Sequence, residues 1–183
     1  KTGLLFSRAS LHSLLGDREK EIADYTAVIN LPDAPVDQVA KALVNRGITH
    51  DQVGETQLAI ADYTAVINLP DAPVDQVSMA LVNRAVRHDE AGGTQRAIAD
   101  CTAVIELPGA PVEQAAIALL YRGITHRQSG ETQLGIDDYT AVISLPGAPI
   151  DLVAMSLYTR GVIHFKESRK DQSKSDFETL VRL

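Results

Sequence analysis

The sequence predicts an all-α protein, an α-solenoid of five antiparallel helix-turn-helix repeats with ten helices. The segment Ile22 to Val39 returns letter for letter from Ile60 to Val77, which is 38 residues further along. Within each copy, apolar residues recur at intervals of three and four, a spacing typical of helices. Proline and glycine fall at equivalent points of the copies, where helices end. Such a period indicates one supersecondary unit per copy, stacked on its neighbours to bury a shared core.

The first helix of each repeat, helix A, can be followed in residues 33–70. Pro35 precedes it, and proline is tolerated there because the first helical N–H groups have no partner within the helix. Val36, Val39 and Leu43 then mark an apolar stripe of a helix of about 16 to 18 residues. Gly54 is expected to end this helix, because glycine readily adopts the left-handed conformation past a helix terminus.

The second helix of each repeat, helix B, follows after a tight turn. Thr56 stands where its N-cap is expected. Ala59, Tyr63 and Val66 form its apolar face, and Pro70 ends it because a residue before proline avoids helical geometry. Helix B should therefore span about 13 residues, and short connections make neighbouring helices antiparallel.

The repeats predict one domain over residues 1–183, a single continuous array. The last helix, residues 170–183, is more polar than its equivalents, and we interpret it as a partial cap of the kind that solenoid ends need. The five repeats are expected at approximately 1–32, 33–70, 71–108, 109–146 and 147–183.

Composition disfavours several classes of partner. The net charge of −7 disfavours binding to nucleic acid, whose phosphates require a basic surface, and binding to an anionic membrane surface. No apolar run approaches the roughly 18 residues that span a bilayer, so we expect no membrane insertion. Lys1 is not a natural start, and we expect the N-terminus to have been cut or processed. The sequence leaves the location open, with the cytoplasm slightly favoured.

The repeat resembles the tetratricopeptide repeat (TPR). The residues that carry the resemblance are Leu43, Gly47, Ala59, Tyr63 and the pair Leu69-Pro70, and they recur in phase over nearly the whole chain. The resemblance implies a right-handed superhelix and a bacterial-type variant of the repeat. The period of 38 departs from the usual 34. The additional residues lie in the Asp33 to Gln38 region, where they should lengthen the turn or helix A.

All five histidines occupy one position of helix A, where the family usually has an aromatic residue. A metal site needs ligands that converge within about 2.1 Å of the ion, whereas stacked repeats separate equivalent residues by roughly 10 Å. We therefore expect no metal and interpret the histidines as packing residues. A pH-sensing role is the alternative. They are His12, His50, His88, His126 and His164.

An arginine of helix A and an aspartate of helix B also recur in every copy. The two positions should lie at a similar level of an antiparallel pair, so we hypothesise a bridge within each hairpin, such as Arg46 with Asp62. A basic ladder for phosphate is the alternative reading, which the in-phase acids disfavour. Cys101 takes the place of a helix-B tyrosine and is interpreted as a small buried residue rather than a reactive thiol.

No constellation of residues indicates catalysis. Threonines recur at equivalent positions of helix B, which favours a scaffold role, and no nucleotide-binding or metalloprotease motif is present. The sequence therefore predicts that this chain is not an enzyme and uses no cofactor.

In the family, the concave face is lined by helix A, and the resemblance implies that a partner lies there. The fourth and fifth repeats bring the only aromatic cluster to this face, and aromatic anchors are typical of binding hot spots. Packing against a neighbouring helix A is the equal alternative for these rings. The residues implied are Val44, Asn45, Ile48, Asp51, Val82, Asn83, Val86, Asp89, Leu120, Tyr121, Ile124, Arg127, Tyr158, Val162 and Phe165, with Thr159 beside them.

The favoured function is a non-catalytic protein–protein interaction scaffold that binds a peptide or protein segment on this face. Family members that clamp a peptide carboxylate use Lys, Asn and Arg there, and only Lys41, Asn45 and Asn83 match part of that set. An apolar groove would better suit a hydrophobic segment or an amphipathic helix. One alternative is a self-associating structural spacer, and hence a homo-oligomer. Another is an accessory interaction domain of a larger enzyme or signalling protein.

Overall fold

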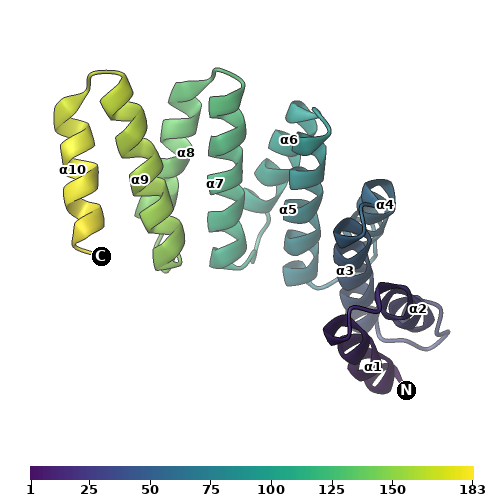
Figure 1. Ribbon diagram of the computed structural model, residues 1–183. Coiled ribbons are helices and arrows are strands. Elements are labelled where there is room, and N and C mark those ends of the chain that lie inside the picture. The colour runs from purple at the N-terminus through teal and green to yellow at the C-terminus, as the bar shows by residue number, and fades with distance from the viewer. The chain divides into compact units, whose positions relative to one another are not determined.

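The computed structural model describes residues 1–183 and contains ten α-helices and no strands, so the chain is an all-α helical repeat solenoid (Figure 1). Each helix A is longer than the helix B that follows it, in the first repeat by one residue only. The helices are α1 (Thr2–Leu14), α2 (Arg18–Ile29), α3 (Val36–Gln52), α4 (Thr56–Ile67), α5 (Val74–Glu90), α6 (Thr94–Ile105), α7 (Val112–Gln128), α8 (Thr132–Ser144), α9 (Ile150–Lys166) and α10 (Lys170–Val181).

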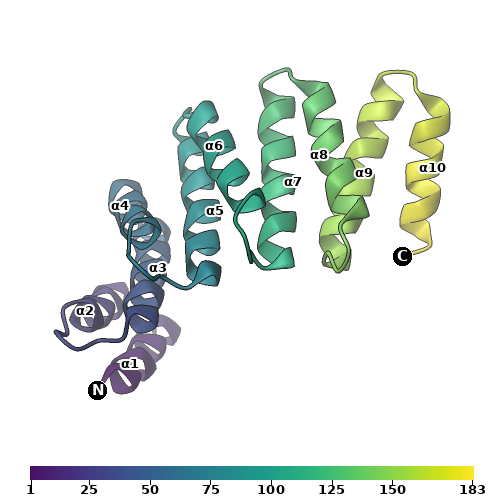
Figure 2. The same ribbon diagram turned by 180° about the vertical axis from the view of Figure 1, so that it is seen from behind.

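Two compact units divide the chain. The first covers Lys1–Arg87 and the second His88–Leu183, so the division falls in the last turn of α5. In the first unit α2 packs on α3, and in the second α7 packs on α6, α8 and α9. Figure 2, seen from behind, shows the hairpins α7–α8 and α9–α10 as antiparallel helix pairs. A single domain over 1–183 stays a prediction.

The ends of helix A follow from proline and glycine, as the sequence predicts. Pro35 has φ −57° and is the N-cap of α3, so helix A begins at the next residue. Part of the segment beyond the usual period therefore lengthens helix A. At the other end, Gly54 has φ +82°, a left-handed conformation that L side chains rarely adopt.

The predicted N-cap of helix B, Thr56, is wrong by one residue. Thr56 is already helical, the N-cap is Glu55, and no side chain caps the helix. The Glu55 N–H donates to the His50 carbonyl at 2.8 Å, as part of the turn that ends α3. This turn makes Glu55 the last residue before α4. Its carboxylate turns back to His50, where Oε2 lies 2.6 Å from Nδ1.

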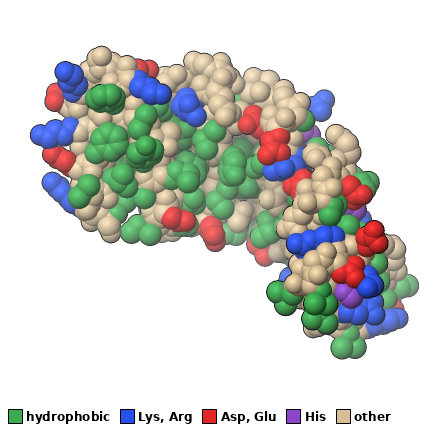
Figure 3. Space-filling model, in the orientation of Figure 1, with side chains coloured by type: hydrophobic (Ala, Val, Ile, Leu, Met, Phe, Trp, Pro, Cys, Tyr) green, Lys and Arg blue, Asp and Glu red, His purple; other side chains and the backbone are tan.

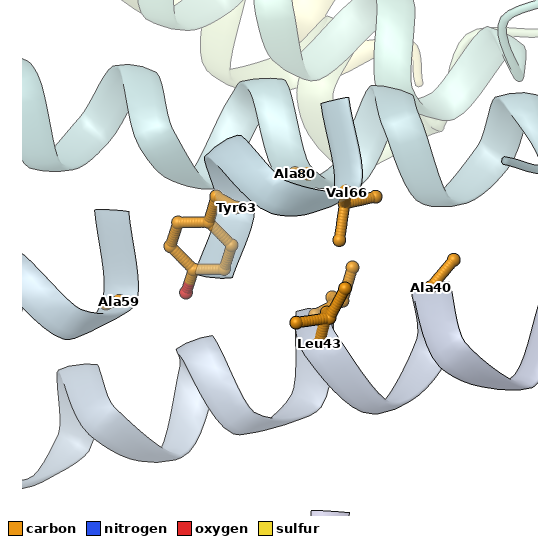
Figure 4. Packing of buried hydrophobic residues seen from close by; sticks show 7 residues of the cluster. Ala40, Leu43, Ala59, Tyr63, Val66 and Ala80 are labelled. Carbon is orange, nitrogen blue, oxygen red and sulfur yellow. The ribbon is translucent and has the colours of Figure 1, made fainter. Parts of the chain in front are cut away.

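The core of the first unit lies between helix A, helix B and the next helix A. Leu43 and Val66 point toward each other across α3 and α4, and the Tyr63 ring is fully buried beside them (Figure 4). A Cβ built on Gly47 would lie 2.6 Å from Tyr63 Cε1. Glycine at this position therefore makes room for the tyrosine ring, a close approach that a larger residue would prevent.

The second unit repeats this arrangement. Leu119, Tyr139 and Val142 are buried in its core, and Ile163 of α9 joins the same cluster. A Cβ built on Gly123 would lie 2.9 Å from Tyr139 Cε1. The same pairing of glycine on helix A with an aromatic ring on helix B thus sets the spacing of both hairpins.

The predicted Arg–Asp bridge forms within four hairpins. In α3 and α4, Arg46 donates from Nε and Nη2 to Asp62 at 2.9 and 2.6 Å. Arg46 Nη1 also donates to Thr26 Oγ1 of the preceding hairpin at 2.9 Å, so one guanidinium ties two repeats together. The other bridges are Arg8–Asp24, Arg122–Asp138 and Arg160–Asp176.

Candidate functional site

The residues predicted on the helix-A face divide into a buried and an accessible group. Val44, Val82 and Leu120 are buried, so they support the face rather than present it. Tyr121, Arg127, Tyr158 and Phe165 are exposed. Those of intermediate exposure are Asn45, Ile48, Asp51, Asn83, Val86, Asp89, Ile124, Thr159 and Val162.

In the first unit, the accessible part of this face is engaged by the chain itself. Asp51 Oδ2 lies 3.1 Å from Arg87 Nε on the next helix A, and the side chains of both are largely buried. Ile48 packs against the core cluster that contains Val44. Asp51 and Arg87 are therefore occupied in holding α3 and α5 together.

In the second unit, the same face contains a cavity of about 360 Å³. Tyr158, Val162 and Lys166 reach it from one side of α9, with Arg127 at the end of α7 and Thr132 at the start of α8. Tyr158 and Lys166 are eight residues apart on one helix, so they lie about 12 Å apart along its axis. Four residues of the predicted face, Arg127, Tyr158, Thr159 and Val162, thus line one concave site.

The cavity combines an apolar wall with two cations. Arg127 and Lys166 are both exposed. The acidic lining residue, Glu167, accepts a hydrogen bond from the Arg169 guanidinium, which compensates its charge. The cavity is therefore locally cationic in a chain whose net charge is −7.

Arg127 stands next to a buried phenol. Burial raises the pKa of Tyr139 above its ordinary value, and Arg127 partly offsets this because a cation favours the phenolate. The Cβ that Gly135 lacks would lie 3.5 Å from the Arg127 Cβ. The Arg127 stem therefore passes close to α8.

The aromatic residues are both packed and exposed. The Tyr158 and Phe177 rings meet edge to face with centroids 6.2 Å apart, so Tyr158 is held against α10. Tyr158 nevertheless keeps 58% of its surface exposed, and Phe165 keeps 68%. Figure 3 shows hydrophobic side chains gathered over α7 and α9, with Lys and Arg side chains at their border.

The sequence interpretation missed Lys166 and Thr132, which line the cavity. Lys166 stands where the three preceding repeats have Gln52, Glu90 and Gln128. Its positive charge departs from that pattern and could have been used to find it. Thr132 begins helix B in a position shared by Thr56 and Thr94, and only the fold shows that it reaches the cavity.

The histidines pack between helix A and helix B, as predicted. Nε2 of His50 lies 3.9 Å from Asp62 Oδ2, and equivalent contacts recur in other repeats. The fifth repeat differs, because His164 meets Arg169 where His50 meets Glu55. Burial, and then the charge of Arg169, lower the pKa of His164 below its ordinary value.

Replacing Arg169 by glutamate is expected to raise the pKa of His164. The substitution removes a like charge and supplies a partner of the kind that His126 has in Glu131, with Nδ1 and Oε2 2.6 Å apart. In the wild type, the folded-state pKa of His164 lies below the ordinary histidine value near 6.5. Stability is therefore lost as pH falls from about 6.5 to the folded-state pKa, because the unfolded chain takes up the proton first. The variant should lose less stability between pH 7 and about 5.

An imidazole titration by NMR measures this directly. His126 serves as the internal control, because the Arg169→Glu substitution leaves its partner Glu131 in place. An unchanged His164 titration would show that Arg169 does not act on the ring.

No cluster of three His, Cys, Asp or Glu side chains could hold a metal ion. Cys101 is buried, and burial raises the pKa of its thiol to about 12, so the nucleophilic thiolate is scarce at neutral pH. No helix is both long and apolar enough to cross a bilayer.

Comparison with known proteins identifies the fold. No protein-family model matches the sequence, and no curated protein does so either. The chain is similar to the solved structure of MamA, with a TM-score of 0.73 and 19% identity over 95% of this chain and 92% of that one.

Two further structures agree with this. BtubC from P. vanneervenii superposes with a TM-score of 0.76 at 15% identity, covering 97% of this chain and 77% of that one. A tetratricopeptide repeat protein from Parabacteroides merdae gives 0.72 at 20% identity, over 99% of this chain and 66% of that one. At these identities the likeness shows the fold alone.

Proposed function

We propose that this chain, whose fold is of the tetratricopeptide-repeat type, is a non-catalytic scaffold that binds a peptide or protein segment on the face of its A helices. The observation that carries the proposal is the cavity between α7, α8 and α9. It combines the exposed ring of Tyr158 and the partly exposed Val162 with two cations, and such a mixture suits protein recognition. No cofactor is required for this function.

The chemistry of the cavity specifies the ligand further. Tyr158 and Val162 offer an apolar wall for one large side chain, and Arg127 and Lys166 lie beside it. A carboxylate placed between the two cations would gain charge-assisted hydrogen bonds. We therefore propose a segment that carries an apolar anchor and an Asp or Glu close to it in space.

The volume is consistent with a side chain and its flanking backbone rather than with a large cofactor. Ligand pockets for drug-sized molecules run from about 300 to 1,000 Å³, and this cavity of about 360 Å³ is near the lower end. The remaining length of a bound segment would lie on the neighbouring helix-A surface, where Tyr121 is exposed.

Selection of peptides from a random display library on the wild-type chain tests the proposal. We expect the selected peptides to be enriched in acidic residues next to Leu, Phe or Tyr. The Arg127→Glu/Lys166→Glu variant should bind them at least about tenfold more weakly, a loss of about 1.4 kcal/mol, because it replaces attraction by repulsion. Binding should also weaken as salt is raised.

The matched control is Lys170→Glu, which reverses an exposed cation of α10 outside the cavity. It should bind the selected peptides as the wild type does. Selected peptides without acidic enrichment, or equal weakening in both variants, would contradict a cationic binding site in this cavity.

A further inference from the structure

The position that Asp51 occupies in the first unit holds a cation in the second. Asp51 pairs with Arg87 of the next helix A, with Oδ2 and Nε 3.1 Å apart. Two repeats later, Arg127 stands where Asp51 does, and Ile163 stands where Arg87 does. The ion pair that joins α3 to α5 therefore has no counterpart between α7 and α9, and Arg127 is an exposed cation of the cavity.

A buried tyrosine lies next to this position in both units. In the first unit, burial, and then the charge of Asp51, raise the pKa of Tyr63, whereas the charge of Arg87 lowers it. Tyr139 is the equivalent residue of the second unit, and it has the charge of Arg127 beside it. The phenol of the second unit thus lacks the anion that Asp51 supplies in the first.

The Tyr139 hydroxyl has no acceptor for its proton. The residue is fully buried, and its Oη has no hydrogen-bond partner. Arg127 lies near the phenol, but a guanidinium has only donors and cannot accept the O–H. Because an unpaired buried donor is costly and rare, this hydroxyl is a candidate to bind an acceptor from outside the chain.

The ring is directed toward the cavity. Tyr139 lies seven residues after Thr132, so the two share one face of α8. Helical side chains lean toward the N-terminus of their helix, so the ring leans toward the first turn of α8, where Thr132 lines the cavity. The ring also passes Gly123, which lies one turn before Arg127 on α7.

The cavity adjoins the ring. Ile163 of α9 lines the cavity and belongs to the same core cluster as Tyr139. In the first unit the equivalent ring has the same direction, since the Tyr63 hydroxyl points toward the Ala59 end of α4 (Figure 4). Arg127 is exposed, so its guanidinium can turn outward while its stem stays beside α8. A carboxylate that enters beside Ile163 would then meet both donors.

We propose that the Tyr139 hydroxyl and Arg127 together bind the carboxylate of an Asp or Glu side chain of the bound segment, in the place that Asp51 has in the first unit. This inference rests on the proposed function, and it adds an interior residue to those that line the cavity. Both groups are donors, so they suit a carboxylate, which only accepts, better than an amide, whose NH2 group donates. The hydroxyl thereby makes the site selective for acid over amide.

Replacing Tyr139 by phenylalanine removes the hydroxyl and keeps the ring. The ligands are a library-selected peptide with one acidic residue and its Asn or Gln analogue, both with an amidated C-terminus. Calorimetric titration of the wild type should show at least about tenfold tighter binding of the acidic peptide. Tyr139→Phe should bind that peptide at least about tenfold more weakly, because a hydrogen bond to a charged group is lost. Its affinity for the amide analogue should stay within about twofold of the wild type.

The matched control is Tyr63→Phe, which removes the equivalent hydroxyl of the first unit and should leave both affinities unchanged. The melting temperature of Tyr139→Phe should not fall, because its hydroxyl loses no partner in the unbound chain. This measurement separates a role in ligand binding from a role in the fold.

Equal affinity of Tyr139→Phe and the wild type for the acidic peptide, with binding still weakened in Arg127→Glu/Lys166→Glu, would overturn this inference and leave the proposed function standing. Equal losses for the acidic and amide peptides in Tyr139→Phe would also overturn it, since the hydroxyl would then act on the fold. Peptides that bind only with a free C-terminus would assign the carboxylate to the chain end instead of a side chain. Failure of every acidic peptide to bind would contradict both proposals.

Discussion

Replacing Tyr63 by alanine is expected to lower the free energy of unfolding of the first unit by about 3–5 kcal/mol. The ring is fully buried between α3 and α4, and Gly47 lies so close that the ring fills the space its missing side chain leaves. No neighbouring side chain can refill that space without moving a helix, so the loss includes both transfer and cavity terms. Denaturant unfolding followed by circular dichroism measures the change.

The control for this substitution is Tyr158→Ala, which removes a tyrosine that is 58% exposed. It should cost less than about 1 kcal/mol, since most of its surface is already in water. Gly47→Ala in the wild type should cost about 1–3 kcal/mol by overpacking, and it should cost less in the Tyr63→Ala background. Additive costs would show that the ring and the glycine are not coupled.

Replacing Asp138 by alanine is expected to destabilise the second unit by about 3 kcal/mol, the lower end of the range for breaking a buried pair. Arg122 donates to this carboxylate from Nε and Nη2 at 3.0 and 2.6 Å, and the Asp138 side chain is buried. The carboxylate raises the pKa of Arg122. Without it the guanidinium still stays charged, because arginine is not deprotonated in proteins. An unpaired cation in a largely buried site is costly.

Asp137 provides the matched control, because it is the next residue of the same helix and is exposed, with a hydrogen bond from Gln133 at 2.9 Å. Asp137→Ala should change the unfolding free energy by no more than about 0.5 kcal/mol. Equal melting temperatures for the two variants would show that the bridge contributes nothing to stability, which is the case for many exposed ion pairs.

Much of the fold could be predicted because the same physical constraint recurs in each copy. Gly47 lies against the Tyr63 ring, and Gly123 lies against the Tyr139 ring. Because each glycine recurs together with its tyrosine, the pair indicated a tight hairpin. The Arg–Asp bridge was readable for the same reason, since each arginine had an acid in phase. The start of helix B was misplaced because Thr56 is a good N-cap in isolation, whereas the closing turn of α3 sets the boundary.

The candidate site was harder to predict from the sequence than the fold. The resemblance assigns Arg127, Tyr158 and Val162 to the same lining as Val44, Val82 and Leu120. Burial of the last three depends on packing between neighbouring helices A, which the resemblance does not specify. Only the fold separates the residues that hold α3 to α5 from those that remain open to a partner in the second unit.

The repeats therefore account for stability, and their departures indicate where partners bind. Lys166, Arg127 and Tyr158 each break the pattern of their own position, and they surround one cavity. These three residues are not needed to form a hairpin, since the other repeats form theirs without them.

Hydrogen exchange of the chain with and without a library-selected acidic peptide tests the central claim, that a protein segment binds the cavity of the second unit. We predict slower exchange in the last turns of α7, the first turn of α8 and the C-terminal half of α9, with no change in α3 and α4. The same peptide should give no protection in Arg127→Glu/Lys166→Glu. Protection confined to α1–α4, or equal protection in the double variant, would contradict it.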